Sequence, residues 1–211
     1  MVGFNPDEEY VHVSVGNETW VVGKIRLEEF MKEAKVEDYK ILKTVNGSEF
    51  EGKKYTHPLL SNISKLEQMA KMENYHIAVA EKFVDVNAGT GIVHLSPANG
   101  EDDYNIAMKR KVEIFSPIDD AVKFTEDAGK YAGMFVRDAD EEIVRDVKEK
   151  NALVKIGKIK HKYPLCWRSK HKLVWLARRE YFYMLDRLGD KAINAAQKVE
   201  YFFDQPKNRF L

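Results

Sequence analysis

Residues 89–104 read Gly-Thr-Gly-Ile-Val-His-Leu-Ser-Pro-Ala-Asn-Gly-Glu-Asp-Asp-Tyr, which predicts a turn, a strand, a tight loop and a helix start. Gly89 and Gly91 lack a Cβ, so the backbone can turn there and be approached closely. Strand alternation places His94 on the face opposite its two apolar neighbours. The acids at 101–103 fall in the first turn of the next helix, where the helix dipole favours negative charge.

The segments around this stretch predict a mixed α/β fold without regular βαβ alternation. Apolar alternation and turn residues predict strands at 11–15, 19–22, 39–45, 48–50, 76–86, 92–95 and 153–159. The Asn46-Gly47 pair predicts a tight hairpin between the third and fourth of these strands. Apolar spacing of three and four predicts helices at 27–34, 63–70, 101–111 and about 178–199. A further helix is expected to open at Asp138, with Glu141 completing a capping box.

Length and composition limit the class of protein. The chain has 211 residues, with 44% hydrophobic and 11% aromatic content, enough for one full domain and a smaller appendage. The single cysteine, Cys166, excludes an internal disulfide and any zinc site built from several cysteines. We find neither a membrane-length apolar run nor a signal-peptide pattern, so we expect a soluble cytoplasmic protein or a piece of one.

Charge is balanced overall but uneven along the chain. The 34 Lys and Arg cancel the 34 Asp and Glu, so no global field attracts nucleic acid or membrane. Residues 155–179 nevertheless hold nine Lys and Arg and no acid, while 101–146 hold thirteen acids against seven bases. With Tyr163, Trp167 and Trp175 interleaved, the basic segment could contact phosphates and bases, or it could be a solvated lysine-rich ribbon. Its candidates for nucleic-acid contact are Lys158, Lys160, Lys162 and Arg168.

The strand–loop–helix stretch is the densest candidate site. Asp103 follows His94 by nine positions across a tight loop, so both could border one pocket, where the carboxylate could bind an ammonium group or orient a water. The acids could equally serve only the helix start, and His94 could be an ordinary histidine on a half-buried strand. The spacing matches no standard metal site or nucleophile motif. The residues alone thus predict a pocket whose ligand is open.

Four motifs in order resemble one family. Residues 89–104 resemble the GTGxVHxxPxxGxDDY signature of the editing domain inserted in isoleucyl-tRNA synthetases. Residues 52–59 resemble its G-x-x-Y-x-H-P-L segment, and 161–168 resemble its H-x-Y-P-x-C-W-R segment. Residues 207–210 resemble the stretch that leads back into the catalytic half. Together the motifs cover nearly the whole chain.

The resemblance implies a fragment of a much longer synthetase. Residues 1–160 would form a compact β-barrel-like editing domain with surrounding helices, lacking its N-terminal threonine-rich strand. Residues 161–211 would be a return strand and helix that lead toward the missing catalytic domain. The parent enzyme would charge tRNA(Ile) with isoleucine, using ATP and Mg in that catalytic domain, whereas editing would need no cofactor and no metal.

The activity implied is proofreading, in which water hydrolyses valyl-tRNA(Ile) or valyl-adenylate in a pocket too small for isoleucine. Asp103 would bind the α-ammonium of the amino acid, and His94 would help to hold the terminal adenosine or the attacking water. The substrate-binding set implied by the resemblance is Gly91, Val93, His94, Ser96, Asp102 and Asp103. The implied partners are the acceptor end of tRNA(Ile), misactivated valine and the rest of the synthetase chain, in a monomer without membrane contact.

Two alternatives stay open. The chain could be a non-catalytic tRNA-binding module that uses the basic segment 155–179 without hydrolysis. It could also be the editing domain of a valyl- or leucyl-tRNA synthetase, which would reject a different amino acid. The valyl domain usually carries an Asp-Pro-x-Asp loop where this chain has Glu-Asp-Asp-Tyr, which favours the isoleucyl enzyme.

Overall fold

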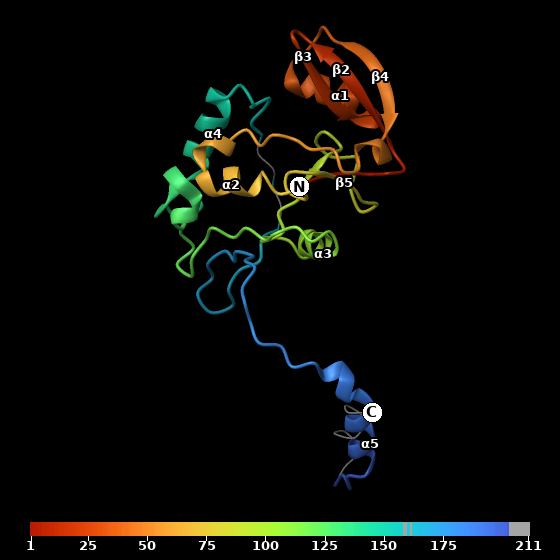
Figure 1. Ribbon diagram of the computed structural model, residues 1–211, viewed down its shortest axis with the longest axis vertical. Helices are drawn as coiled ribbons and strands as arrows, with labels where there is room; N and C mark the ends of the chain where they lie inside the picture. Colours follow the sequence, from red (N-terminus) through yellow and green to blue (C-terminus); the bar gives the residue numbers. More distant parts are fainter. Residues whose placement is uncertain (158–159, 161, 203–211) are drawn as a thin grey trace. The chain divides into compact units, whose positions relative to one another are not determined.

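The computed structural model describes residues 1–157, 160 and 162–202 and divides the chain into two units (Figure 1). The first unit is Met1–Ala177, and the second begins at Arg178. In the described part of the second unit, a 3-10 turn at Leu185–Leu188 leads into α5, Gly189–Gln197. This helix is shorter than the one predicted over 178–199. The domain boundary expected near residue 160 stays a prediction.

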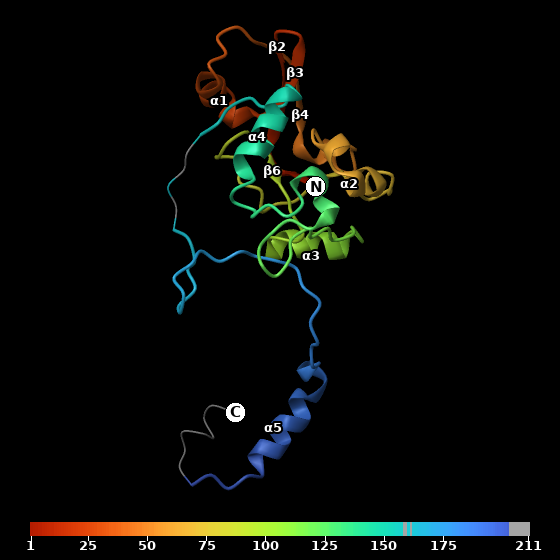
Figure 2. The ribbon, with the colours of Figure 1, turned by 90° about the vertical axis from the view of Figure 1, so that its left-hand side faces the viewer.

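One three-stranded sheet of the first unit is antiparallel, in the order β3-β2-β4. Its strands are β2 (Glu9–Val15), β3 (Glu18–Gly23) and β4 (Lys40–Asn46). Helix α1, Leu27–Ala34, lies against the sheet in Figures 1 and 2. Its Leu27 and Met31 are buried with Val11, Val13 and Val22, so this sheet and helix share one apolar core.

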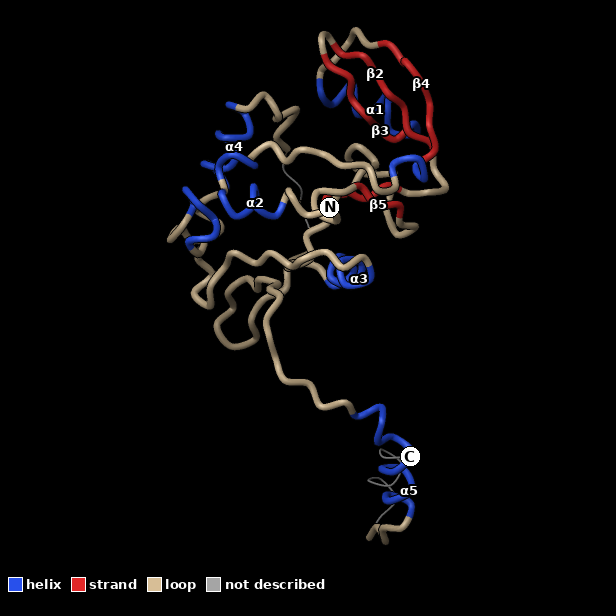
Figure 3. Tube along the Cα trace, viewed as in Figure 1, coloured by secondary structure: helices blue, strands red, loops and turns tan. Residues whose placement is uncertain are grey.

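A second sheet holds the strand that carries the candidate site. Its order is β5-β1-β6, with β1 (Val2–Phe4) parallel to β5 (Ala78–Ala80) and antiparallel to β6 (Val93–His94). Figure 3 shows the strands gathered as two separate groups. Helix α3, Glu101–Lys109, buries Ile106 and Ala107 against Val79 and Leu95 of this sheet region. The described residues therefore form two small sheets and no closed barrel, so the barrel-like form expected from the resemblance is not confirmed.

The remaining helices cover a third apolar cluster, made of Ile63, Leu66, Ala128 and Tyr131. They are α2 (Ser64–Met69) and α4 (Asp140–Glu149). Short 3-10 turns stand at Lys24–Arg26, Gly47–Phe50, Leu60–Asn62 and Glu126–Tyr131. None of the helices in the described part of the chain is long and apolar enough to cross a membrane.

The hairpin predicted at Asn46-Gly47 is wrong. Asn46 ends β4 and caps a 3-10 turn instead: its side chain accepts from Ser48 N at 3.1 Å, and Glu49 accepts from Asn46 N at 3.1 Å. Glycine is required at position 47 for a reason other than a left-handed turn. A Cβ at Gly47 would stand 1.9 Å from Asn5 O, so glycine is needed for close backbone approach.

Three further expectations are wrong in detail. The strand expected at 153–159 is not formed over the described residues 153–157. The helix expected to open at Asp138 begins at Asp140 without a side-chain cap, so the capping box is absent. The long strand expected at 76–86 is reduced to β5, because its continuation turns away at the Glu81–Val84 turn.

A buried carboxylate fixes α4 to the rest of the first unit. Asp146 is 4% exposed and accepts a hydrogen bond from Lys130 Nζ at 2.6 Å. It also accepts from the Tyr131 hydroxyl and from Asn62 Nδ2, the latter at 3.3 Å. The hydrogen bond from Lys130 is the main cause that lowers the pKa of Asp146 below its ordinary value.

We expect Asp146→Asn to lower the free energy of unfolding by about 1–3 kcal/mol at pH 7, because hydrogen bonds to a charged group are lost. A lowered carboxylate pKa gives stability that is complete above the ordinary value and lost as pH falls through the folded-state value. The difference from the unchanged chain should therefore shrink as pH falls from 6 to below 3.8. Urea unfolding measures both effects.

Glu149→Gln is the matched control, since Glu149 is an exposed acid on the same helix. It should change the free energy of unfolding by less than about 0.5 kcal/mol. A difference for Asp146→Asn that does not depend on pH would contradict the role given to the charge.

Candidate functional site

A pocket of about 420 Å³ opens beside β6 in the first unit. Its apolar wall includes Met1, Ile63, Leu66, Leu95, Pro97, Val112, Phe115, Pro117, Ile118, Phe124 and Ile143. Its polar lining includes His57, Tyr75, His76, His94, Ser96, Asn99 and Glu113. The pocket thus combines a large apolar surface with a few polar groups, which is the usual make-up of a small-molecule site.

Of the predicted pair, His94 lines this pocket and Asp103 does not, although the Asp103 carboxylate interacts electrostatically with His94. His94 ends β6 and lines the pocket, while Leu95 turns into the core with 1% exposure, as strand alternation predicts. The loop that follows is closed by Ser96 N, which donates to Asp103 Oδ2 at 2.7 Å. This hydrogen bond joins the Asp103 carboxylate, in the first turn of α3, to Ser96, which lines the pocket.

Asp103 keeps half of its acceptor capacity free within the described structure. Its Oδ2 serves the Ser96 backbone, whereas Oδ1 accepts no hydrogen bond from any described residue. A carboxylate oxygen has about two acceptor positions, so Oδ1 can receive a donor from a ligand. The helix-start role and a binding role for Asp103 are therefore compatible.

The electrostatic surroundings of His94 favour the neutral ring. Partial burial lowers its pKa below the ordinary value, and the nearby Asp103 carboxylate opposes that effect without reversing it. His94 is therefore neutral near pH 7 and can accept a proton on one ring nitrogen.

Three other predicted site residues lie, like Asp103, outside the pocket lining. Gly91 O accepts a hydrogen bond from the Tyr10 hydroxyl at 2.9 Å, in a turn held against the first sheet. Val93 packs against the core that contains Leu95, and Asp102 is exposed on α3. A substrate-binding role for Gly91, Val93 and Asp102 stays a prediction.

Among the candidates for nucleic-acid contact, Arg168 lies in a short loop of the first unit. Leu165 and Lys172 form an isolated antiparallel bridge, with Arg168 near its tip. The Arg168 guanidinium lies 4.8 Å from the centre of the Trp167 ring, and Trp167 is 77% exposed. Lys160 and Lys162 are exposed, and Lys158 lies outside the described residues. Contact with RNA stays a prediction for all four basic residues.

Two histidines of the pocket were missed as site residues. His57 belongs to the motif at 52–59, which supports the resemblance without indicating a site residue. His76 begins a predicted strand and carries no other signal. Their rings stack at 5.6 Å with an interplanar angle of 18°. Burial lowers the pKa of His76 to about 4, with His57 adding to the effect. The His57-Pro58 pair was the one feature of the sequence that could have indicated His57 as a site residue.

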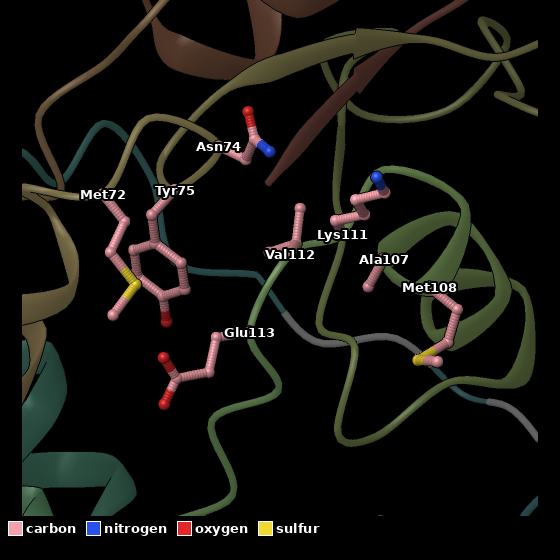
Figure 4. Close-up of a pocket in the computed structure, with 8 residues that line it drawn as sticks. All are labelled: Met72, Asn74, Tyr75, Ala107, Met108, Lys111, Val112 and Glu113. Atoms are coloured by element: carbon pink, nitrogen blue, oxygen red, sulfur yellow. The ribbon is translucent and has the colours of Figure 1, made fainter.

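A neighbouring pocket of about 460 Å³ shares Tyr75, Val112 and Glu113 with the first (Figure 4). Figure 4 shows Met72 and Tyr75 on one side and Met108 of α3 on the other. This pocket contains no histidine, whereas the other is lined by His94 and Ser96, so the pocket at β6 is the candidate site. No group of three His, Cys, Asp or Glu that could hold a metal ion occurs among the residues described.

The fold gives a class first: it is of the kind seen in GlLeuRS-CP1. The crystal structure of GlLeuRS-CP1 matches with a TM-score of 0.54 over 75% of this chain and 78% of that chain. At 15% identity, this likeness concerns the fold alone. No family model matches the chain.

The sequence comparison then gives particular relatives. The chain is 38% identical to an isoleucine–tRNA ligase of Methanocaldococcus jannaschii, across all of this chain and 21% of that protein. It is 40% identical to the isoleucine–tRNA ligase of Saccharolobus solfataricus, across 99% of this chain and 21% of that protein. The whole chain thus matches a segment of isoleucine–tRNA ligases and spans about one fifth of the length of these relatives.

We expect the pKa of His94 to lie below 6.5 and to fall further in Asp103→Asn, because the carboxylate stabilises the charged ring. Asp102→Asn removes the same charge one position away, on an exposed side chain, and should change the His94 pKa less. NMR titration measures the pKa of His94 in the unchanged chain and in the two variants. An unchanged His94 pKa in Asp103→Asn would contradict the proximity of the pair.

Proposed function

We propose that this chain is the proofreading domain of an isoleucyl-tRNA synthetase and hydrolyses the valyl ester of tRNA(Ile) or valyl-adenylate. The observation that carries the proposal is the joining of Asp103 to the pocket lining: Ser96, which lines the pocket, donates its backbone N–H to Asp103 Oδ2 at 2.7 Å. A carboxylate in that position suits the α-ammonium group of an amino acid. Kinship with isoleucine–tRNA ligases supports the same assignment.

The apolar wall supplies the size selection. A pocket for isoleucine cannot strongly reject valine, since one methylene changes binding by only about 1–3 kcal/mol, a limit for which isoleucyl-tRNA synthetase is itself a standard example. A second pocket that admits valine and excludes the larger isoleucine overcomes this limit. The side chains of Phe115, Ile118 and Phe124 form the part of the wall best suited to that exclusion.

Water is the proposed nucleophile. The water oxygen attacks the ester carbonyl, a proton of the water passes to a base, and the bond to the ribose oxygen breaks. The base returns the proton to the departing ribose oxygen, which leaves valine and a free hydroxyl. A neutral His94 at the pocket edge can take that proton. Asp103 holds the amino group, which fixes the carbonyl in the pocket and lowers the entropic cost of attack.

The wider role follows from the family. We propose that the chain acts within a longer cytoplasmic synthetase that charges tRNA(Ile) with isoleucine at the expense of ATP. The acceptor end of the tRNA would reach the pocket, with the basic residues of 155–179 contacting its phosphates. The remaining synthetase chain is the expected partner, in a monomeric enzyme.

A binding module without hydrolysis is the second candidate. The observation that favours it is the exposed loop carrying Trp167 and Arg168, whose stacked side chains could contact RNA independently of the pocket. A leucyl or valyl origin is less well supported, since the sequence relatives reported above are isoleucine–tRNA ligases.

The deciding experiment is deacylation of valyl-tRNA(Ile) and isoleucyl-tRNA(Ile) by this chain. We expect release of valine but not isoleucine, and a loss of about tenfold to a hundredfold in Asp103→Ala, because hydrogen bonds to a charged group are removed. Glu101→Ala is the matched control, since Glu101 is an exposed acid of the same helix turn and lies outside the pocket at β6.

The binding-module candidate predicts a different result. Salt-dependent tRNA binding without release of either amino acid would favour it over hydrolysis. Equal release of valine and isoleucine would contradict the size selection, and full activity in Asp103→Ala would contradict the role of the carboxylate.

A further inference from the structure

His57 is held in one orientation by a tight turn. Leu59 N donates to His57 Nδ1 at 3.1 Å, and Leu60 N donates to His57 O at 3.1 Å. Pro58, between them, has a fixed φ and carries no N–H. The ring of His57 is thus tied to the backbone through one nitrogen, in the way that an aspartate or asparagine side chain closes its own turn.

This contact determines which nitrogen of His57 carries the proton. A backbone N–H can only donate, so Nδ1 must present its lone pair to Leu59. In the neutral ring the proton then stands on Nε2. Burial lowers the pKa of His57, and the neighbouring His94 adds to the effect, so the neutral ring prevails near pH 7.

A buried stack supports the back of the ring. His76 is 7% exposed, lies parallel to His57 at 5.6 Å and contacts the rings of Tyr55 and Tyr75 at 5.2 and 4.7 Å. His76 Nδ1 is buried without a hydrogen-bond partner among the described residues. The stack and the turn together restrict the rotation of His57.

The remaining nitrogen of His57 has no protein partner in the described structure. His57 lines the same pocket as His94 and Ser96, and its Nε2 makes no hydrogen bond to any described residue. The ring is therefore a neutral donor of fixed orientation in a largely apolar pocket. A donor in such surroundings favours an acceptor oxygen on a ligand.

We propose that His57 Nε2–H donates a hydrogen bond to the carbonyl oxygen of the aminoacyl group bound in this pocket. The inference rests on the proposed function and adds a third polar contact to it: Asp103 receives the ammonium group, His94 the water, and His57 the carbonyl. The carbonyl oxygen gains negative charge as water adds to the carbon, so a preorganised donor stabilises that change.

Two substitutions separate this role from a structural one. His57→Asn keeps an acceptor where Nδ1 stands, so the Leu59 turn can persist, but it removes the donor to the pocket. His57→Gln places an amide N–H near the former Nε2 and removes the acceptor of the turn. If His57 has only a structural role, His57→Asn should bind the ligand better than His57→Gln. If it has the proposed role, His57→Gln should bind the ligand better than His57→Asn.

Binding of a non-hydrolysable probe tests the proposal without requiring turnover. The probe is the adenosine analogue in which a 3′-amide replaces the valyl ester, and its dissociation constant is measured by calorimetry. We expect His57→Asn to bind about fivefold to tenfold more weakly than the unchanged chain and His57→Gln to stay within about threefold, which corresponds to one neutral hydrogen bond. Circular dichroism confirms that both variants fold.

The outcomes distinguish this inference from the proposed function. If the unchanged chain fails to bind the probe, both are overturned. If it binds, Asp103→Ala weakens binding and His57→Asn binds like the unchanged chain, only the role of His57 is overturned. Histidine ¹⁵N NMR adds a direct readout: the proton of His57 should be on Nε2, and that nitrogen should shift when the probe binds. A proton on Nδ1 would also overturn the proposal.

Discussion

The hydrogen bond from Ser96 N to Asp103 Oδ2 is the contact on which the site depends. It joins the end of β6 to the first turn of α3 at 2.7 Å and so fixes the loop between them. A Cβ at Gly100 would stand 2.9 Å from that same carboxylate oxygen, so the glycine leaves room for the bond. The loop sequence is thus explained by the closure of the strand–helix junction as much as by any ligand.

The turn before β6 is positioned from the other side, by the first sheet. The Tyr10 hydroxyl accepts from Asn5 N at 2.8 Å and donates to Gly91 O at 2.9 Å, and Gly23 N donates to Thr90 O at 2.8 Å. Tyr10 is fully buried on β2, on the face opposite the α1 core. The two small sheets are therefore coupled through Tyr10 and through the Gly23–Thr90 hydrogen bond, without closing into a barrel.

Apolar periodicity within a segment correctly predicted the strands and helices that are determined by their own apolar face. The strands at 11–15 and 19–22 and the helix at 27–34 were predicted because each presents one apolar face to the same core. The Asn46-Gly47 hairpin failed because the decisive constraint was a contact with Asn5, distant in the chain, that single-segment reasoning does not include. The buried Asp146 network was missed for the same reason, since Asn62 and Lys130 meet it only in the folded unit.

In the candidate site, too, the residues that are close in the chain could be predicted together and the distant one could not. His94 and Asp103 could be paired from sequence because nine residues and one tight loop connect them. His57 belongs to the same pocket, yet it is far from both in the chain, and neither periodicity nor spacing indicates the contact.

Electrostatics give the pocket a preference that none of its residues has alone. Burial keeps His57, His76 and His94 neutral near pH 7, so the charged groups of the pocket lining are the Glu113 carboxylate and the Met1 ammonium, and Asp103 interacts with that ammonium. A ligand that brings one ammonium group and an apolar side chain complements both the charge and the apolar wall. A free carboxylate on the ligand would add a further negative charge to a pocket that already holds the Glu113 carboxylate. The pocket should therefore favour an esterified amino acid over the free one, which allows the product acid to leave after hydrolysis.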